Sequence, residues 1–338
     1  MSPAGITAAG IFVVDRIHTV DRYPAEEGLG EIQATTAGNG GGPWNLLTDL
    51  ARLGATFPLR AIGLTGDDAE GAFVRAHCRR HGIDVRGLGI CRQAPTSTCE
   101  VMTSADNGRR TFFHRRGANA RLDERHIARA LRPGRIFYLG YPLLMDRLDR
   151  RVGATTGAAL ALRAARRRGF TTAVDLVGVA GPLAEVLTPA LPWIDHLLLN
   201  DSECERLTGI CVRRRGRPLP SSLPRVIARL RALGCRGTVV LHQCEGVWAE
   251  DAQGRRSVQG RIEVPRTQIA GTNGAGDALA AGYLYAVHEG QDLATALWWG
   301  SCAAAASLRS PTASDGVASL RACLALGRRH GALRLDEA

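Results

Sequence analysis

Apolar positions along the chain follow two alternating rhythms from about Leu46 onward. Segments with apolar residues three or four apart predict helices, whereas short continuous apolar runs predict strands buried on both faces. The helical segments are residues 46–55, 70–82, 155–169 and 223–234, and the apolar runs are residues 58–66, 135–140, 172–178, 196–200 and 237–243. An apolar stretch near the N-terminus predicts the first strand. The alternation predicts an α/β fold with an open, doubly wound, mostly parallel sheet flanked by helices, which binds ligands at the carboxyl ends of its strands.

Two β-rich segments interrupt this alternation, residues 17–37 and residues 91–116. Within the second, Asn107 and Gly108 stand between two β-prone runs, which is a strong hairpin signal. We expect the two segments to pair into a small β-sheet that forms a lid over a cleft. The α/β domain then comprises residues 1–16, 38–90 and 117–338.

Composition narrows the possible classes of function. The formal net charge is +11 and the isoelectric point is near 9.8, but all 43 basic residues are Arg and they are spread along the chain without an aromatic-interleaved tract. We therefore expect no nucleic-acid partner. The nine Cys form no C-x-x-C pair, which argues against a disulfide framework and a structural zinc site. No signal peptide and no apolar run of about 18 residues is present, so we expect a cytoplasmic protein without a membrane partner.

The strongest chemical signal is a Gly-Ala-Gly turn, residues 274–276, that precedes an apolar helix expected to begin at Asp277. Small residues at a helix start leave backbone N–H groups exposed, and the helix dipole adds partial positive charge, so the turn is a candidate phosphate site. Asp277 is placed to accept a proton from an attacking hydroxyl. The alternative is that Asp277 only caps the helix.

A second candidate pair follows the apolar run 196–200. Asn200 and Glu203 are three residues apart, so both lie on one side of a first helical turn, where they could orient a hydrated magnesium ion and phosphate oxygens. The alternative is a helix capping box, which has the same spacing.

Two further features suit a polyhydroxyl ligand. Consecutive glycines in residues 37–45 let the backbone approach a ligand closely before a helix that is expected to start near Asn45. Asp15, at the end of the first apolar strand, can accept hydrogen bonds from sugar hydroxyls. The alternative for the glycines is a flexible turn, and the alternative for Asp15 is a helix cap or a surface acid.

These motifs, in this order, resemble the ribokinase-like PfkB carbohydrate kinase family over nearly the whole chain. GGGPWNLLTDLARLGA followed by GLTGDDAEG is similar to the family's N-terminal signature, TNGAGDALAAGYLYA to its C-terminal signature, and NDSE to its Asn-x-x-Glu motif. The resemblance implies ATP as phosphoryl donor and Mg²⁺ as the required ion.

The resemblance also implies a role for each matching residue. Asp277 would be the catalytic base, and Gly274, Ala275 and Gly276 the anion hole. Asp15, Gly41, Asn45, Asn119 and Arg115 would bind the acceptor, the last two from a stretch entering from the lid. Asn200, Glu203, Gly246, Thr272 and Ser301 would contact the nucleotide, with Glu203 acting indirectly on Mg²⁺.

The sequence departs from the family pattern at two positions. Gly271 replaces an aspartate that helps hold a monovalent cation in family members, which puts activation by K⁺ in doubt. Gln243 replaces a glycine in the nucleotide-binding stretch. These departures motivate an alternative from another class, a non-catalytic sugar- or nucleotide-binding protein.

The acceptor and the assembly follow from the same groups. Asp15 and Asn45 favour an unphosphorylated sugar or a nucleoside, whereas Arg115 and Arg116 keep a sugar acid or sugar phosphate as the alternative. The exposed edges and unused face of a lid sheet favour a homodimer.

Overall fold

The computed structural model describes residues 4–106 and 108–335, and within them nine strands form one large sheet. Seven strands are parallel, and the last two, β16 and β17, add antiparallel at one edge. In spatial order the sheet contains β17 (Arg256–Gly260), β16 (Gly246–Glu250), β15 (Thr238–Gln243), β12 (His196–Asn200), β11 (Thr171–Asp175), β8 (Ile136–Gly140), β1 (Ile6–Gly10), β4 (Leu59–Gly66) and β5 (Ile83–Cys91). The expected doubly wound, mostly parallel sheet is confirmed.

Side chains of the central strands enter two separate hydrophobic cores. In β8, Ile136 and Tyr138 belong to one core, whereas Phe137 and Leu139 belong to the other. Successive side chains of a strand point to opposite faces, so a strand covered on both faces must be apolar at every position. This explains why continuous apolar runs in the sequence mark the strands.

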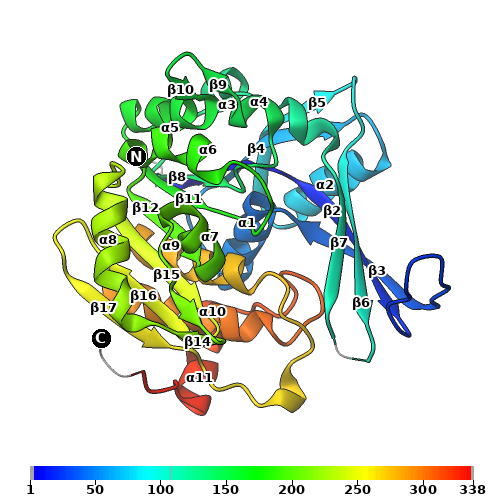
Figure 1. Cartoon of the computed structure of the whole chain (residues 1–338). Helices are drawn as coiled ribbons and strands as arrows, with labels where there is room; N and C mark the ends of the chain where they lie inside the picture. Colours follow the sequence, from blue (N-terminus) through cyan, green and yellow to red (C-terminus); the bar gives the residue numbers. More distant parts are fainter. Residues whose placement is uncertain (1–3, 107, 336–338) are drawn as a thin grey trace.

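Helices cover both faces of the large sheet (Figure 1). One core includes side chains of α1 (Gly42–Leu53), α2 (Ala69–Arg80), α9 (Ala275–His288), α10 (Leu293–Ser307) and α11 (Leu320–His330). The other includes α3 (Glu124–Ala130), α4 (Asp146–Asp149), α5 (Gly157–Arg167), α6 (Leu183–Leu187), α7 (Asp201–Thr208) and α8 (Leu223–Ala232). None of the helices in the described ranges is both long enough and apolar enough to span a bilayer.

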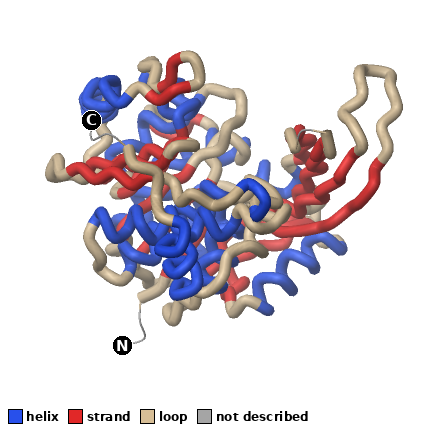
Figure 2. Tube along the Cα trace, turned by 90° about the horizontal axis from the view of Figure 1, so that it is seen from below, coloured by secondary structure: helices blue, strands red, loops and turns tan. Residues whose placement is uncertain are grey.

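A small four-stranded sheet projects from one side of this body (Figures 1 and 2). Its spatial order is β3 (Ile32–Gly40), β2 (Val13–Val20), β6 (Ser97–Ser104) and β7 (Arg110–Arg115). The pairs β2–β3 and β6–β7 are antiparallel, whereas β2 and β6 run parallel. The hairpin expected at Asn107 and Gly108 joins β6 to β7, although Asn107 itself lies outside the described residues.

Candidate active site

A cavity of about 910 Å³ lies between the carboxyl ends of the central strands and the inner face of the small sheet. The body contributes Asp175 from the end of β11, Asn200 from the end of β12 and His242 from β15, together with the turn before α9. The small sheet contributes residues of β2, β6 and β7. The cavity therefore occupies the place where doubly wound sheets bind ligands.

The turn before α9 has the geometry of an anion site. Gly274 is the residue that precedes the helix, with φ of 74°, and a side chain there would collide with the carbonyl of Ala313. The first helical hydrogen bond runs from Ala278 N to the Gly274 carbonyl at 2.8 Å, which leaves the N–H groups just before it without helical partners. The helix begins at Ala275, two residues before the position expected from the sequence.

Asp277 lies in the first turn of α9 and does not cap it, so the capping alternative is wrong. Its carboxylate is buried and is held by two donors. The side-chain amide of Asn45 donates to Oδ2 at 2.9 Å, and the hydroxyl of Tyr141 donates to Oδ1 at 2.7 Å. Burial raises the pKa of Asp277 to about 6, while the hydrogen bonds from Asn45 and Tyr141 lower it. A carboxylate with this pKa is ionised near neutral pH and can accept a proton.

A buried polar network connects Asp277 to the glycine-rich segment. Asn39 donates from its side-chain amide to Oδ1 of Asn45 at 2.7 Å and to the hydroxyl of Ser314 at 2.8 Å. Because the oxygen of Asn45 is fixed by Asn39, its NH₂ group must face Asp277. The network therefore orients the carboxylate of Asp277 through residues from both the N-terminal and the C-terminal part of the chain.

The glycines of this segment serve close packing rather than flexibility. Gly41 has φ of 87° and precedes α1, which begins at Gly42 and not at Asn45 as expected. A side chain at Gly40 would overlap the carboxylate of Asp15. Gly40 therefore leaves room for Asp15 beside the cavity.

Asp15 lies on β2 of the small sheet, not at the end of the first strand as expected, because β1 ends at Gly10. It is 8 % exposed and lines the cavity, and its side chain is hydrogen-bonded to Asn273 in the anion-site turn. Burial, with a smaller contribution from the charge of Asp277, raises the pKa of Asp15 to about 8. Asp15 is therefore mostly protonated at neutral pH and can donate as well as accept hydrogen bonds.

Asn200 and Glu203 form the capping box that the sequence left as an alternative. Asn200 Oδ1 accepts from Glu203 N and Glu203 Oε2 accepts from Asn200 N, both at 2.9 Å. Both side chains also line the cavity, and burial raises the pKa of Glu203 to about 7.

No group of three or more His, Cys, Asp or Glu in residues 4–106 and 108–335 gathers as a metal site. A divalent ion here would need phosphate and water ligands, which is the usual manner of Mg²⁺.

Several polar residues of the cavity were missed from the sequence, among them Tyr141, Asp175, His242 and Arg110. Tyr141 has φ of 63°, a strained conformation for a side chain of its size. Burial raises the pKa of Asp175 well above its usual range and lowers that of His242 to about 4. An acid or histidine at the end of a buried strand is the signal that could have identified Asp175 and His242.

The comparisons with known proteins agree with this geometry. The model of the pfkB family of carbohydrate kinases matches residues 4–319. The chain belongs to this family. Among its relatives, a ribokinase of Arabidopsis thaliana is 26 % identical over 75 % of this chain and 62 % of its own length, so the match spans less than two thirds of that relative. A 1-phosphofructokinase of Rhodobacter capsulatus is 28 % identical over 83 % of both chains.

The fold is shared with solved structures of the family. The structure of Arabidopsis thaliana ribokinase complexed with ribose and ATP superimposes with a TM-score of 0.77 at 21 % identity, covering 96 % of this chain and 99 % of that one. The expected pfkB family of carbohydrate kinases and the ribokinase-like fold are therefore confirmed.

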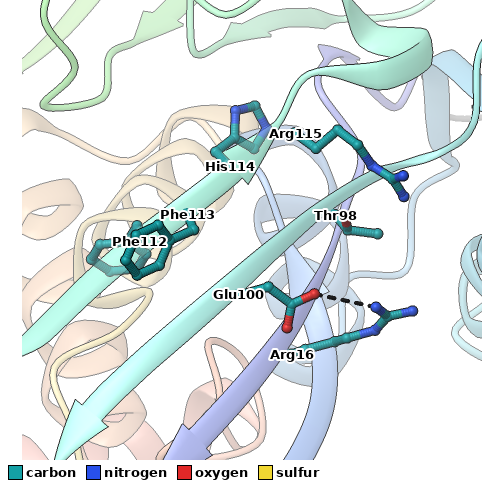
Figure 3. A pocket seen from close by; sticks show the side chains of 7 residues that line it. All are labelled: Arg16, Thr98, Glu100, Phe112, Phe113, His114 and Arg115. Carbon is teal, nitrogen blue, oxygen red and sulfur yellow. Dashed lines mark hydrogen bonds and ion pairs between the residues drawn. The ribbon is translucent and has the colours of Figure 1, made fainter. Parts of the chain in front are cut away.

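Four residues nominated from the pfkB resemblance do not lie among the described residues that line the cavity. Arg115 faces away from it and lines a pocket on the outer face of the small sheet with Arg16, Thr98 and Glu100 (Figure 3). Asn119 is fully buried and bonds the backbone of Phe12 and the hydroxyl of Ser97.

The other two are nucleotide-contact candidates. Gly246 closes the β15–β16 hairpin, where a side chain would collide with the carbonyl of Gln259, and Ser301 is buried within α10. The remaining nominated residues do line the cavity: Asp15, Gly41, Asn45, Asn200, Glu203, Thr272, Gly274, Ala275, Gly276 and Asp277.

Proposed function

We propose that this member of the pfkB family transfers the γ-phosphoryl group of ATP to a hydroxyl group of a small sugar or nucleoside. The observation that carries the proposal is the buried carboxylate of Asp277, which is held by two donors beside an exposed row of backbone N–H groups. A protein that only bound ligands would need no base at this place. The ribose and ATP bound in the Arabidopsis ribokinase structure support a sugar as the acceptor and ATP as the phosphoryl donor.

In the proposed reaction Asp277 removes the proton from the acceptor hydroxyl, and the oxygen forms a bond to the γ-phosphorus. The bond from that phosphorus to the bridging oxygen of ADP breaks, so the products are the phosphorylated acceptor, ADP and a proton carried by Asp277. The N–H groups of Gly274, Ala275 and Gly276 donate to the charge on the phosphoryl oxygens. Tyr141 and Asn45 keep the carboxylate ionised and oriented.

The nucleotide end of the cavity fits a magnesium-bound triphosphate. Thr272, Asn200 and Glu203 lie there, and the carboxylate of Glu203 would hold ion-bound water rather than the ion itself. Bound Mg²⁺ supplies neutralisation of phosphate charge. Gly271 has no side chain that could coordinate K⁺, so no role in the reaction is proposed for this ion.

We also propose that the small sheet acts as a lid. Its inner face forms one wall of the cavity, and Asp15 already bridges from β2 to Asn273 of the anion-site turn. Closure onto the acceptor would exclude water, which would otherwise hydrolyse ATP. The outer face of the same sheet carries exposed apolar side chains that a second copy of the chain could cover.

The test is ADP release from magnesium-ATP with a panel of pentoses, hexoses, nucleosides, sugar acids and sugar phosphates, comparing the wild type with Asp277→Asn. We expect one acceptor class to stimulate release, and the variant to retain ATP binding while turnover falls about 10²-fold or more. Near-normal turnover of the variant would remove Asp277 from the mechanism. Binding of sugar without ADP release in the wild type would favour the non-catalytic alternative.

A further inference from the structure

The inner face of the small sheet carries two buried nitrogen atoms that lack partners. Arg110, Phe112 and His114 alternate along β7 and line the cavity. Nε of Arg110 and Nε2 of His114 are both shielded from solvent, and neither has a hydrogen-bond partner among the described residues. Buried donors are rarely left unpaired in a folded protein, and an unfilled ligand site is one place where they are.

Arg110 brings a charge that the protein itself leaves uncompensated. The charge on a guanidinium persists at any physiological pH, and no carboxylate in the described part of the chain lies within ion-pair distance of Arg110. The carboxyl group that acts on it electrostatically is Asp15. Because the pKa of Asp15 is raised to about 8, that group is mostly neutral at pH 7.

The neighbouring arginine of the cavity is already paired. Arg116 donates to the carboxylate of Asp146 in a close ion pair. Burial and the charge of Arg116 lower the pKa of His114, so His114 adds a neutral donor or acceptor and no charge. Of these three residues, Arg110 is therefore the one whose positive charge is available to a ligand.

Gly271 explains how Arg110 reaches this position. The guanidinium of Arg110 lies directly over Gly271, and even a β-carbon at that residue would collide with Nη2. The glycine that replaces the family's aspartate at residue 271 thus faces the guanidinium of Arg110 on the small sheet. A glycine at 271 leaves space for the guanidinium, and an acid there would neutralise it.

The site lies beside the groups that would hold the acceptor. Asp15 is two strands away from β7 in the small sheet, its charge acts on Arg110, and its side chain bonds Asn273 two residues after Gly271. A ligand that reaches both Asp15 and Asp277 therefore passes Arg110.

We infer that Arg110 binds an anionic group, a carboxylate or a phosphate, carried by the acceptor, and so determines the substrate class of the enzyme. The inference rests on the proposed kinase function and deepens it. A planar guanidinium donates two parallel hydrogen bonds to either anion, so the two sources share one recognition chemistry. Nε2 of His114 can donate or accept one more bond from the same ligand.

The test compares acceptors in matched pairs that differ by the anionic group: gluconate with glucose, fructose 1-phosphate and fructose 6-phosphate with fructose, and ribose 5-phosphate with ribose. ADP release gives kcat/KM for each, and calorimetry without nucleotide gives the affinity. We expect at least one anionic member to exceed its neutral partner about tenfold or more. Whether the gluconate pair or a phosphate pair shows the preference distinguishes the two sources.

The variant Arg110→Gln keeps a side chain that can donate hydrogen bonds, although a shorter one, and removes its charge. We expect it to weaken binding of the anionic acceptor roughly 10- to 100-fold and to leave the neutral partner unchanged. Gly271→Asp, which places a carboxylate against the guanidinium, should have the same selective effect. Arg22→Gln, at an exposed arginine of the loop that joins β2 to β3, is the charge-matched control and should change neither.

The outcomes separate this inference from the proposed function. Binding of anionic acceptors that depends on Arg110 but gives no ADP release would retain the inference and overturn the kinase proposal. Turnover of neutral acceptors by a wild type that prefers no anionic member of any pair would support the kinase proposal and overturn the inference. Equal loss for both members of a pair, or no binding of any anionic member by the wild type, would overturn the inference.

Discussion

The polar groups that line the cavity differ in whether they have hydrogen-bond partners: those around Asp277 are paired, whereas those on β7 of the small sheet are not. Around the reaction centre, the polar groups bond one another: Asp277 with Asn45 and Tyr141 of the body, and Asn45 with Asn39 at the end of β3. On the small sheet, Arg110 and His114 present buried nitrogen atoms that have no partner in the described residues. The groups that hold Asp277 are paired without a ligand, whereas the nitrogen atoms of Arg110 and His114 are not.

This difference separates two tasks of the enzyme. Phosphoryl transfer is the same reaction for every acceptor, so its groups gain from being fixed before the substrate arrives. The relatives are named for different acceptors, and we propose that recognition of the acceptor draws on the separate small sheet, whose side chains can change without disturbing the body. The expectation is that substitutions in the body lower turnover and substitutions on the small sheet change affinity.

The largest effect should come from the anion-site turn. Gly274→Ala forces a side chain into a left-handed conformation against the Ala313 carbonyl, so we expect turnover to fall about 10²–10³-fold as the N–H groups move. Gly276→Ala is the matched control for strain, because its β-carbon would lie 3.5 Å from His242. It should fold with unchanged melting temperature yet bind ATP less tightly. Normal turnover in Gly274→Ala would show that the body wall is not preorganised.

The next effect concerns the donors to Asp277. In the proposed mechanism ionised Asp277 is the active form, and its pKa is about 6, so kcat should fall as the pH drops below about 6. The bond from Tyr141 lowers that pKa; Tyr141→Phe should therefore move the acidic limb of the pH profile to higher pH and reduce kcat about tenfold at pH 7. If Tyr141→Phe left the acidic limb of the pH profile unshifted, that limb would report the titration of a group other than Asp277.

Asp15 offers a test on the side of the small sheet, through stability. Its pKa is about 8 in the folded chain against an ordinary 3.8, so the folded state holds the proton more tightly. Its contribution to the free energy of unfolding is therefore lost as pH rises from about 4 through about 8. Asp15→Asn cannot ionise, and denaturant titrations should show a flatter dependence over this window, together with a higher KM for the acceptor. A slope equal to that of the wild type would contradict the assigned pKa.

The smallest effect on catalysis is expected from the outer face of the small sheet. Phe113 is 53 % exposed there and lines the same outer pocket as Arg115 (Figure 3). If two copies associate through this face, Phe113→Glu should convert a dimer to a monomer by light scattering while kcat changes little. A wild-type protein that is monomeric at micromolar concentration would contradict the proposed homodimer.

The sequence was sufficient to predict the α/β body. Strands such as β8 are apolar at every position because both faces are covered, and this pattern needs no knowledge of distant contacts. The anion-site turn was also predictable, because glycines and the helix that follows are neighbours in the chain. Its helix start was misplaced by two residues, since Gly274 and not Asp277 precedes the helix.

The side chains that approach from the small sheet could not be predicted in the same way. In a strand the inward and outward positions differ by one residue, so Arg115 was nominated where Arg110 and Arg116 line the cavity. Asn119 was nominated by its place in the family pattern, but its amide bonds Phe12 and Ser97. Which face of β7 meets the cavity depends on its pairing with β6, which lies outside the reach of local sequence patterns.

The network around Asn39 has a consequence for the order in which the enzyme becomes active during synthesis. Asn39 joins Asn45 to Ser314, and Asn45 reaches Asp277, so one buried cluster draws on segments about 275 positions apart in the chain. A nascent chain that has left the ribosome up to α8 holds Asp15 and Asn45 but neither the base nor the anion-site turn. In the proposed mechanism such a chain cannot transfer a phosphoryl group until α9 has emerged.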